Sequence, residues 1–240
     1  MRRLTFIACA LVAASCACAE KRTVERIRYD VDGDGRPDTI VLINTSDEHD
    51  DGDFTRIDLL FGNSRRYTFT NEDRWIRWDI NDWDRSRIAR NVPSLIKSKR
   101  VALVNTVEGD RLLVAFEFPY ASSSGRLSVF RISRNGVKRV LNNEMDLVKI
   151  ADIDHDGRTD IVGSETSEAY ADDCSSYDPD VVYTLDGTFK LNRVLTERYD
   201  RSVDGSYERN HAKFFVLVQP NGKRVVLPNS EQARCGQGKK

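Results

Sequence analysis

The stretch Asp30-Val31-Asp32-Gly33-Asp34-Gly35-Arg36-Pro37-Asp38 recurs as Asp152-Ile153-Asp154-His155-Asp156-Gly157-Arg158-Thr159-Asp160. Both copies read D-x-D-x-D-G-R-x-D, so each places four carboxylates within nine residues. Four like charges this close repel one another strongly unless a cation lies among them. The alternating aspartates turn three oxygens toward one point, and the glycine permits a sharp bend. Oxygen-only ligands on a flexible loop favour Ca²⁺ over Mg²⁺ or a transition metal.

Outside these loops the hydrophobic pattern is that of short β-strands bounded by Gly, Asn, Asp and Ser. The pairs Asn135-Gly136, Asp186-Gly187 and Asn221-Gly222 are typical of hairpin turns. The predicted strands cover residues 40–43, 57–61, 67–70, 101–104, 112–118, 127–132, 137–141, 147–150, 181–185, 189–191, 214–218 and 224–227. The sequence therefore predicts an all-β protein, built either as incomplete propeller-like blades or as a two-sheet β-sandwich.

Residues 71–99 depart from the strand pattern and are expected to form a helix or a long loop. Trp75, Trp78 and Trp83 are spread among charged residues in this segment. A helix would place Trp75 and Trp78 on one face. Two interpretations stay open, because the tryptophans could form an aromatic surface for a glycan or a partner protein, or pack on the β core.

The first 19 residues read as a leader for export. Arg2 and Arg3 precede an apolar stretch over residues 4–14, and Ala17-Cys18-Ala19 matches a signal peptidase site before Glu20. The apolar stretch is too short to span a bilayer. Lipoprotein processing at Cys16 is the alternative, and both predict a protein in the periplasm or outside the cell. Residues 20–240 then form a calcium-binding all-β domain with halves 20–145 and 146–240.

Two cysteines, Cys174 and Cys235, lie outside the leader. In an exported chain such a pair is predicted to form one disulfide, with two unpaired thiols as the alternative. The acidic stretches 46–53 and 171–180 each follow the strand after an aspartate loop. They either add oxygens to the cation sites or are solvated loops.

The patterns of charged and apolar residues exclude a nucleic-acid partner and a transmembrane span. Lysine and arginine number 37 against 38 acidic residues, for a net charge of −1. Without a basic block, no nucleic-acid partner is expected, and without a second long apolar stretch, no transmembrane span is expected.

The aspartate loops are not EF-hands, because an EF-hand needs a carboxylate at the twelfth loop position. Here that position holds Val41 and Gly163, and both loops run into apolar, strand-like residues. D-x-D-x-D-G-x-x-D leading into a strand resembles the calcium loop of the FG-GAP and VCBS repeats found in integrin-type β-propellers. The resemblance implies two Ca²⁺ sites, with side-chain ligands Asp30, Asp32, Asp34, Asp38, Asp152, Asp154, Asp156 and Asp160 and backbone ligands Arg36 and Arg158.

The resemblance covers about 30 residues around each loop. Residues 105–118 form a degenerate middle unit that includes Glu108-Gly109-Asp110 but lacks the ladder of carboxylates. The chain is too short for a closed propeller of that family, so incomplete blades or a sandwich with propeller-style loops remain.

Catalytic motifs are missing from the sequence. The only histidines are His49, His155 and His211, and there is no H-E-x-x-H, no G-x-S-x-G and no glycine-rich phosphate loop. We therefore expect no enzyme but an exported calcium-binding interaction module with a protein or glycan partner in the cell envelope. The alternative is a periplasmic inhibitor of a lysozyme-type cell-wall hydrolase, because the chain also resembles small exported bacterial inhibitors, with Ser123-Ser124-Gly125 as the inhibitory loop.

Overall fold

A computed structural model describes residues 22–45, 53–77, 92–117, 126–164 and 180–203, with the backbone of 214–218 and 224–228. Three four-stranded antiparallel sheets contain most of these residues, so the prediction of an all-β protein is confirmed. The first sheet holds β1 (Arg22–Tyr29), β2 (Asp38–Asn44), β3 (Phe54–Leu60) and β4 (Arg66–Trp75). The second holds β5 (Val101–Asn105), β6 (Arg111–Phe116), β7 (Arg126–Ser133) and β8 (Gly136–Glu144). The third holds β9 (Asp146–Ala151), β10 (Asp160–Ser164), β11 (Asp180–Asp186) and β12 (Thr188–Leu191).

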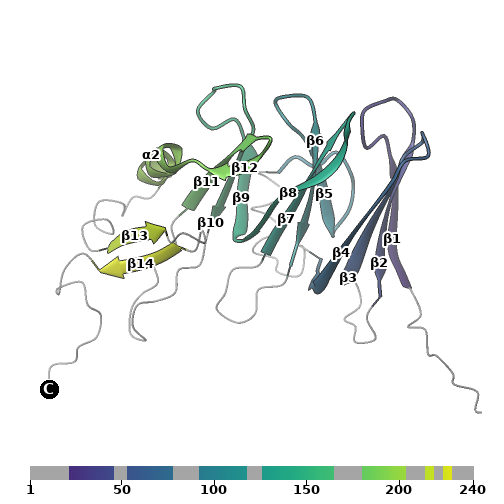
Figure 1. The fold of residues 1–240 in the computed structure, drawn as a ribbon, viewed down its shortest axis with the longest axis horizontal. Helices are drawn as coiled ribbons and strands as arrows, with labels where there is room; N and C mark the ends of the chain where they lie inside the picture. Colours follow the sequence, from purple (N-terminus) through teal and green to yellow (C-terminus); the bar gives the residue numbers. More distant parts are fainter. Residues whose placement is uncertain are drawn as a thin grey trace, which may run out of the picture.

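Within each sheet, strands that follow one another in sequence lie side by side. The three sheets stand next to one another in chain order, and β13 (Phe214–Val218) and β14 (Arg224–Pro228) form a separate two-stranded sheet (Figure 1). Short turns join β3 to β4, β5 to β6, β7 to β8 and β11 to β12, and such a turn returns the chain antiparallel to the strand that it has just left.

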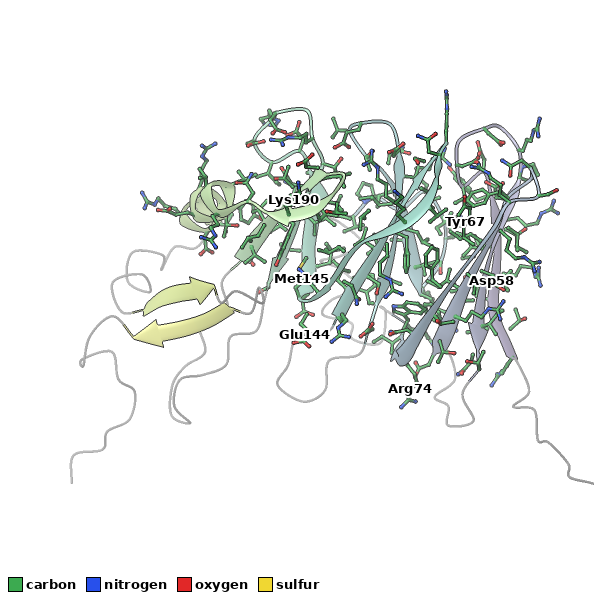
Figure 2. All side chains as sticks on the ribbon, in the orientation of Figure 1. Asp58, Tyr67, Arg74, Glu144, Met145 and Lys190 are labelled. Carbon is green, nitrogen blue, oxygen red and sulfur yellow. The ribbon has the colours of Figure 1, made fainter. Side chains whose placement is uncertain are left out.

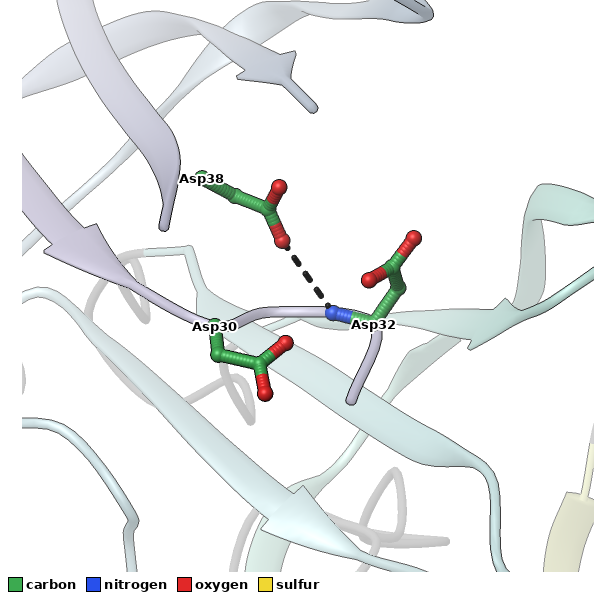
Figure 3. Close-up of side chains that lie close together, drawn as sticks. All are labelled: Asp30, Asp32 and Asp38. Carbon is green, nitrogen blue, oxygen red and sulfur yellow. Dashed lines mark hydrogen bonds between the residues drawn. The ribbon is translucent and has the colours of Figure 1, made fainter. Parts of the chain in front are cut away.

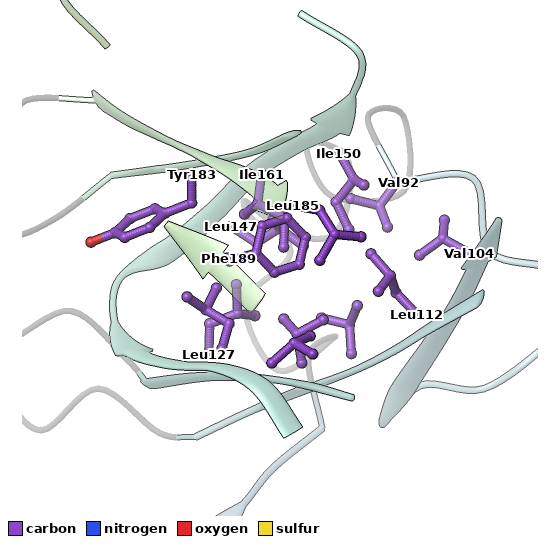
Figure 4. Close-up of a cluster of buried hydrophobic side chains, with 14 of the residues drawn as sticks. Val92, Val104, Leu112, Leu127, Leu147, Ile150, Ile161, Tyr183, Leu185 and Phe189 are labelled. Atoms are coloured by element: carbon purple, nitrogen blue, oxygen red, sulfur yellow. The ribbon is translucent and has the colours of Figure 1, made fainter. Parts of the chain in front are cut away.

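The middle sheet packs against a neighbouring sheet on each of its two faces. Successive side chains of a strand point to opposite faces, so one strand contributes to two cores. Leu112 and Val114 of β6 join a core shared with the third sheet (Figure 4). Leu113 and Ala115 of the same strand join a core shared with the first sheet. The continuous apolar run in β6 is therefore the sequence of a strand packed between two neighbours.

The far face of the third sheet is covered by α2 (Arg193–Val203), which the sequence analysis missed. Leu195 packs there with Val148, Val162 and Val182. Asn192 caps the helix, because its Oδ1 accepts the backbone N–H of Leu195 at 3.0 Å. The helix is short and mostly polar, so its single buried stripe gives a weak periodic signal.

Every predicted strand overlaps a strand of the structure, and β1 is a further strand that was not predicted. β10 lies where the second aspartate loop was expected to run into strand-like residues, although no strand range was predicted there. The expectation of a helix or loop from residue 71 was wrong at its start, because β4 continues to Trp75. Trp75 is 0% exposed, contacts Phe54 and Phe130, and donates its indole N–H to Ser128 Oγ at 3.2 Å. Of the two interpretations, packing on the β core is confirmed for this tryptophan.

Several predictions fall on residues outside the described ranges. These are the leader 1–19 with Cys16, the pair Cys174 and Cys235, Trp78, Trp83, His49, His211, the segment 123–125 and most of both acidic stretches. Among the residues that the structure describes, no helix is long and apolar enough to cross a membrane.

Candidate cation sites in two aspartate loops

The two aspartate loops occupy equivalent places in the fold. The first connects β1 to β2, and the second connects β9 to β10, so each joins the first two strands of its sheet. The β5–β6 turn, residues 106–110, has the corresponding place in the middle sheet. All three connections lie at the same edge of the molecule (Figure 1).

The loops share a hydrogen-bonded framework. Asp30 Oδ2 accepts the backbone N–H of Gly35 at 3.1 Å, and Asp152 Oδ2 accepts that of Gly157 at 3.0 Å. The two glycines have φ angles of +83° and +84°, a left-handed conformation that L-residues with a Cβ avoid. The glycine at the sixth position therefore lets the backbone turn back toward the first aspartate.

The ninth-position aspartates are buried anchors of the loops. Asp38 is 2% exposed and accepts the N–H groups of Val31 at 2.7 Å and Gly62 at 2.8 Å. Asp160 is 0% exposed and accepts the N–H of Ile153 at 2.9 Å and the hydroxyl of Thr184 at 2.6 Å. Both carboxylates thus tie the second loop residue to the strand that follows the loop.

Carboxylate oxygens converge in both loops. In the first loop, Asp30, Asp32 and Asp38 place ligand atoms within 4.8 Å of one another (Figure 3). In the second loop, Asp152, Asp154 and Asp156 place ligand atoms within 4.8 Å of one another.

The other predicted ligands have local partners. Asp34 Oδ1 accepts the backbone N–H of Arg36 at 2.8 Å, and Asp156 Oδ1 accepts that of Arg158 at 2.9 Å. Asp34 and Asp160 lie outside the two groups of converging oxygens. His155, at the fourth loop position, is exposed, as the sequence pattern predicts.

Each loop holds one buried carboxylate oxygen without a hydrogen-bond partner. These atoms are Asp30 Oδ1 and Asp154 Oδ1, and no other such side-chain atom occurs among the described residues. An unpaired buried carboxylate oxygen costs free energy, because it has lost its water and gained no donor. A cation in each loop would supply the missing partner.

The pKa values of the loop carboxyl groups shift in both directions, and the hydrogen bond from the Arg158 side chain lowers the pKa of Asp156. Burial raises the pKa of Asp32, and the charge of Asp38 adds to this effect. Burial also raises the pKa of Asp160, although hydrogen bonds from Thr184 and Ile153 act in the opposite direction. A bound cation would favour the ionised forms of both carboxyl groups.

Arginines supply part of the positive charge. Arg65, in the turn before β4, binds Asp32 Oδ2 through Nη2 at 2.8 Å. Arg158 donates from Nε to Asp156 Oδ2 at 2.7 Å. Arg111 of β6 donates to the backbone carbonyl of Asp30 and lies 5.6 Å from the centre of the Tyr29 ring. The sequence analysis did not identify Arg65 or Arg111, since neither lies near the loop in sequence.

The middle sheet contacts both aspartate loops. Arg111 reaches the first loop, and Glu108 of the β5–β6 turn accepts two hydrogen bonds from Thr159 in the second. The loops therefore lie at the junctions between sheets, where a bound ion would stabilise the packing of neighbouring sheets.

No protein-family model, curated protein or solved structure matches this chain.

Proposed function

We propose that each aspartate loop binds one Ca²⁺ ion and that the ions stabilise an exported interaction module. The observation that carries this proposal is the unpartnered buried oxygen in each loop, Asp30 Oδ1 and Asp154 Oδ1. Both belong to groups of three converging carboxylates, and the same loop framework is built twice. The backbone framework repeats, while the converging carboxylates belong to loop positions one, three and nine in the first loop and one, three and five in the second. Three carboxylates therefore meet at two equivalent places in the fold, which argues for a common ligand.

Ca²⁺ fits the chemistry of these loops better than other common cations. All converging side-chain atoms are carboxylate oxygens, which suit hard cations. Mg²⁺ demands near-ideal octahedral geometry, whereas Ca²⁺ accepts six to eight oxygens in irregular arrangements. The neighbouring backbone carbonyls, including those of Arg36 and Arg158, and water molecules would complete the coordination.

A structural role for the ions follows from where the loops lie. Each loop contacts the middle sheet, so an ion would hold a sheet-to-sheet junction together. We interpret the three sheets as propeller-style blades that form an open row, in keeping with the resemblance to FG-GAP and VCBS repeats. The module would act by binding a protein or glycan and not by catalysis, and residues 1–19 support an exported location.

Thermal unfolding of the full chain with added Ca²⁺, Mg²⁺ or EDTA tests the proposal. Exported calcium modules have Kd values of roughly 10⁻⁴ to 10⁻³ M, so each site should add about 0.4–1.4 kcal/mol at millimolar Ca²⁺. Mg²⁺ should give a much smaller gain. Asp30→Asn and Asp154→Asn should each remove the part of the calcium-dependent stabilisation that one site contributes. The double variant should lose nearly all of this stabilisation.

The matched control is Glu197→Gln, which removes one exposed carboxylate from α2, away from both loops. It should leave the calcium response unchanged. An equal response to Ca²⁺ in the wild type and in the double variant would exclude the two loops as the binding sites.

A further inference from the structure

The outer face of the first sheet, which points away from the other two sheets, carries a second set of ordered polar groups. The strand register identifies the residues of this face. One row across the four strands consists of the cross-strand neighbours Arg28, Thr39, Leu60 and Arg66. Side chains one residue further along point the other way, as Tyr67 does toward the second sheet (Figure 2). A row of this kind presents four side chains on one surface.

The adjacent row holds Arg26, Val41, Asp58 and Thr68. Asp58 lies on the side of the sheet away from the second sheet (Figure 2). It is the single acidic residue in these rows, and Arg56 of the same face binds it in a bidentate manner at 2.8 and 2.7 Å. Thr68 donates a further hydrogen bond at 2.8 Å, so the Asp58 carboxylate is already neutralised.

Four arginines, Arg26, Arg28, Arg56 and Arg66, share this face with the single carboxylate of Asp58, so positive charge is in excess although Arg66 also acts electrostatically on Asp58. Arg26, Arg28 and Arg66 are exposed, and none of them makes a hydrogen bond or ion pair within the described ranges. Arg26 and Arg28 are two residues apart on one strand, which separates them by about 7 Å, whereas Arg66 lies three strands away, at about 14 Å. This spacing suits an extended ligand with more than one anionic group.

We propose that the outer face of the first sheet docks an extended acidic polypeptide segment. Charge complementarity calls for an anionic ligand, and a guanidinium group matches the geometry of a carboxylate. Partly exposed Leu60 lies between Arg28 and Arg66, and partly exposed Ile43 lies opposite Arg56 in a further row of the same face. Both would receive apolar side chains of such a segment. A glycan or a single-stranded nucleic acid is less well matched, because the rows contain no aromatic side chain for stacking.

This proposal does not depend on cation binding and is tested directly with a peptide. The probe is a fluorescein-labelled peptide of alternating glutamate and valine, titrated with the full chain at low salt in calcium buffer and followed by anisotropy. The triple variant R26Q/R28Q/R66Q should bind about tenfold more weakly. The control K97Q/K138Q/K149Q removes three exposed lysines elsewhere, hence the same charge, and should lose less than about twofold.

Equal losses in both triple variants would overturn the proposal, because binding would then follow net charge alone. Tight binding of phosphatidylserine vesicles or of a polyanionic glycan, without binding of the acidic peptide, would assign the face to another class of partner. If the triple variant unfolds at the assay temperature, Arg66→Gln alone provides the test. It should weaken peptide binding about two- to threefold and leave the melting temperature unchanged.

Discussion

The Glu108 carboxylate accepts two hydrogen bonds from Thr159, one from its backbone N–H at 2.9 Å and one from its hydroxyl at 2.7 Å. The Thr159 hydroxyl in turn accepts the N–H of Val107 at 2.9 Å, and the Thr159 carbonyl accepts that of Leu185 at 2.9 Å. Thr159 is 1% exposed and precedes the buried anchor Asp160. One residue thus connects the middle sheet, the second aspartate loop and β11.

Glu108→Gln should destabilise the protein by about 1 kcal/mol, because one charged acceptor of the Thr159 hydrogen bonds is replaced by an amide donor. Urea unfolding at neutral pH measures this loss. Glu197→Gln on α2 is the control and should cost much less, since its ion pair with Arg201 is exposed. A loss no greater than that of the control would show that the Glu108–Thr159 contact does not hold the junction.

The same contact predicts a pH dependence. Burial tends to raise the pKa of Glu108, but the hydrogen bonds from Thr159, together with those from its own backbone and from Thr106, outweigh burial, so the pKa lies below the ordinary 4.5. A carboxyl group with a lowered pKa in the folded state stabilises the protein above its unfolded-state pKa, and this contribution is lost as the pH falls through the folded-state value. The stability difference between wild type and Glu108→Gln should therefore shrink on acidification below about pH 4.5.

Asp38→Asn should lower the free energy of unfolding much more than Asp34→Asn, although both residues lie in one loop. Asp38 is buried and accepts N–H groups of Val31 and Gly62, so Asn, with one fewer acceptor oxygen, should cost about 1–3 kcal/mol even in EDTA. Asp34 is exposed and accepts only local N–H groups, so its variant should be nearly neutral in EDTA. Chemical unfolding in EDTA measures both, and equal costs would contradict the anchor role of Asp38.

Gly157→Ala should destabilise by about 1–2 kcal/mol through the backbone alone. The glycine has a φ of +84°, and a Cβ there would meet nothing within 4 Å, so steric contact does not contribute. Gly35→Ala tests the same position in the first loop, where φ is +83°. Thermal unfolding in EDTA measures both variants, and Glu197→Ala at an exposed position of α2 serves as the control. Neutral results at both glycines would mean that the loops adopt other backbone conformations.

Gly163→Ala in β10 should destabilise for a different reason. A Cβ at this position would lie 2.5 Å from Met145 Cε, 2.8 Å from its Sδ and 3.1 Å from the Asp146 carbonyl oxygen. Overpacking of this kind costs about 1–3 kcal/mol. The double variant with Met145→Val should lose less than the sum of the two single variants, because the shorter side chain leaves room for the new methyl group. Additive losses in urea unfolding would contradict this packing.

The strand content, the hairpins at Asn135-Gly136 and Asp186-Gly187 and the loop chemistry were predictable from sequence, because local residue pattern dictates each of them. In the second loop, the converging Asp152, Asp154 and Asp156 follow from their alternate spacing. In the first loop, Asp38 joins Asp30 and Asp32 in place of Asp34, which alternate spacing did not predict. β1 was missed because its apolar residues are few and its arginines face outward. The helical option at Trp75 was wrong because tertiary pairing of β4 with β3 overrode the local pattern.

The sequence by itself determined that this chain is all-β and carries two acidic loops suited to a hard cation, because periodicity and residue chemistry act over a few neighbouring positions. Only the tertiary structure decided that Leu112 and Leu113 enter different cores and that Asp38 and Asp160 are buried anchors. Likewise, only the fold brought Arg65, Arg111 and Glu108 to the loops. These contacts join residues 33 to 81 positions apart, and such pairings depend on how the sheets pack as whole units.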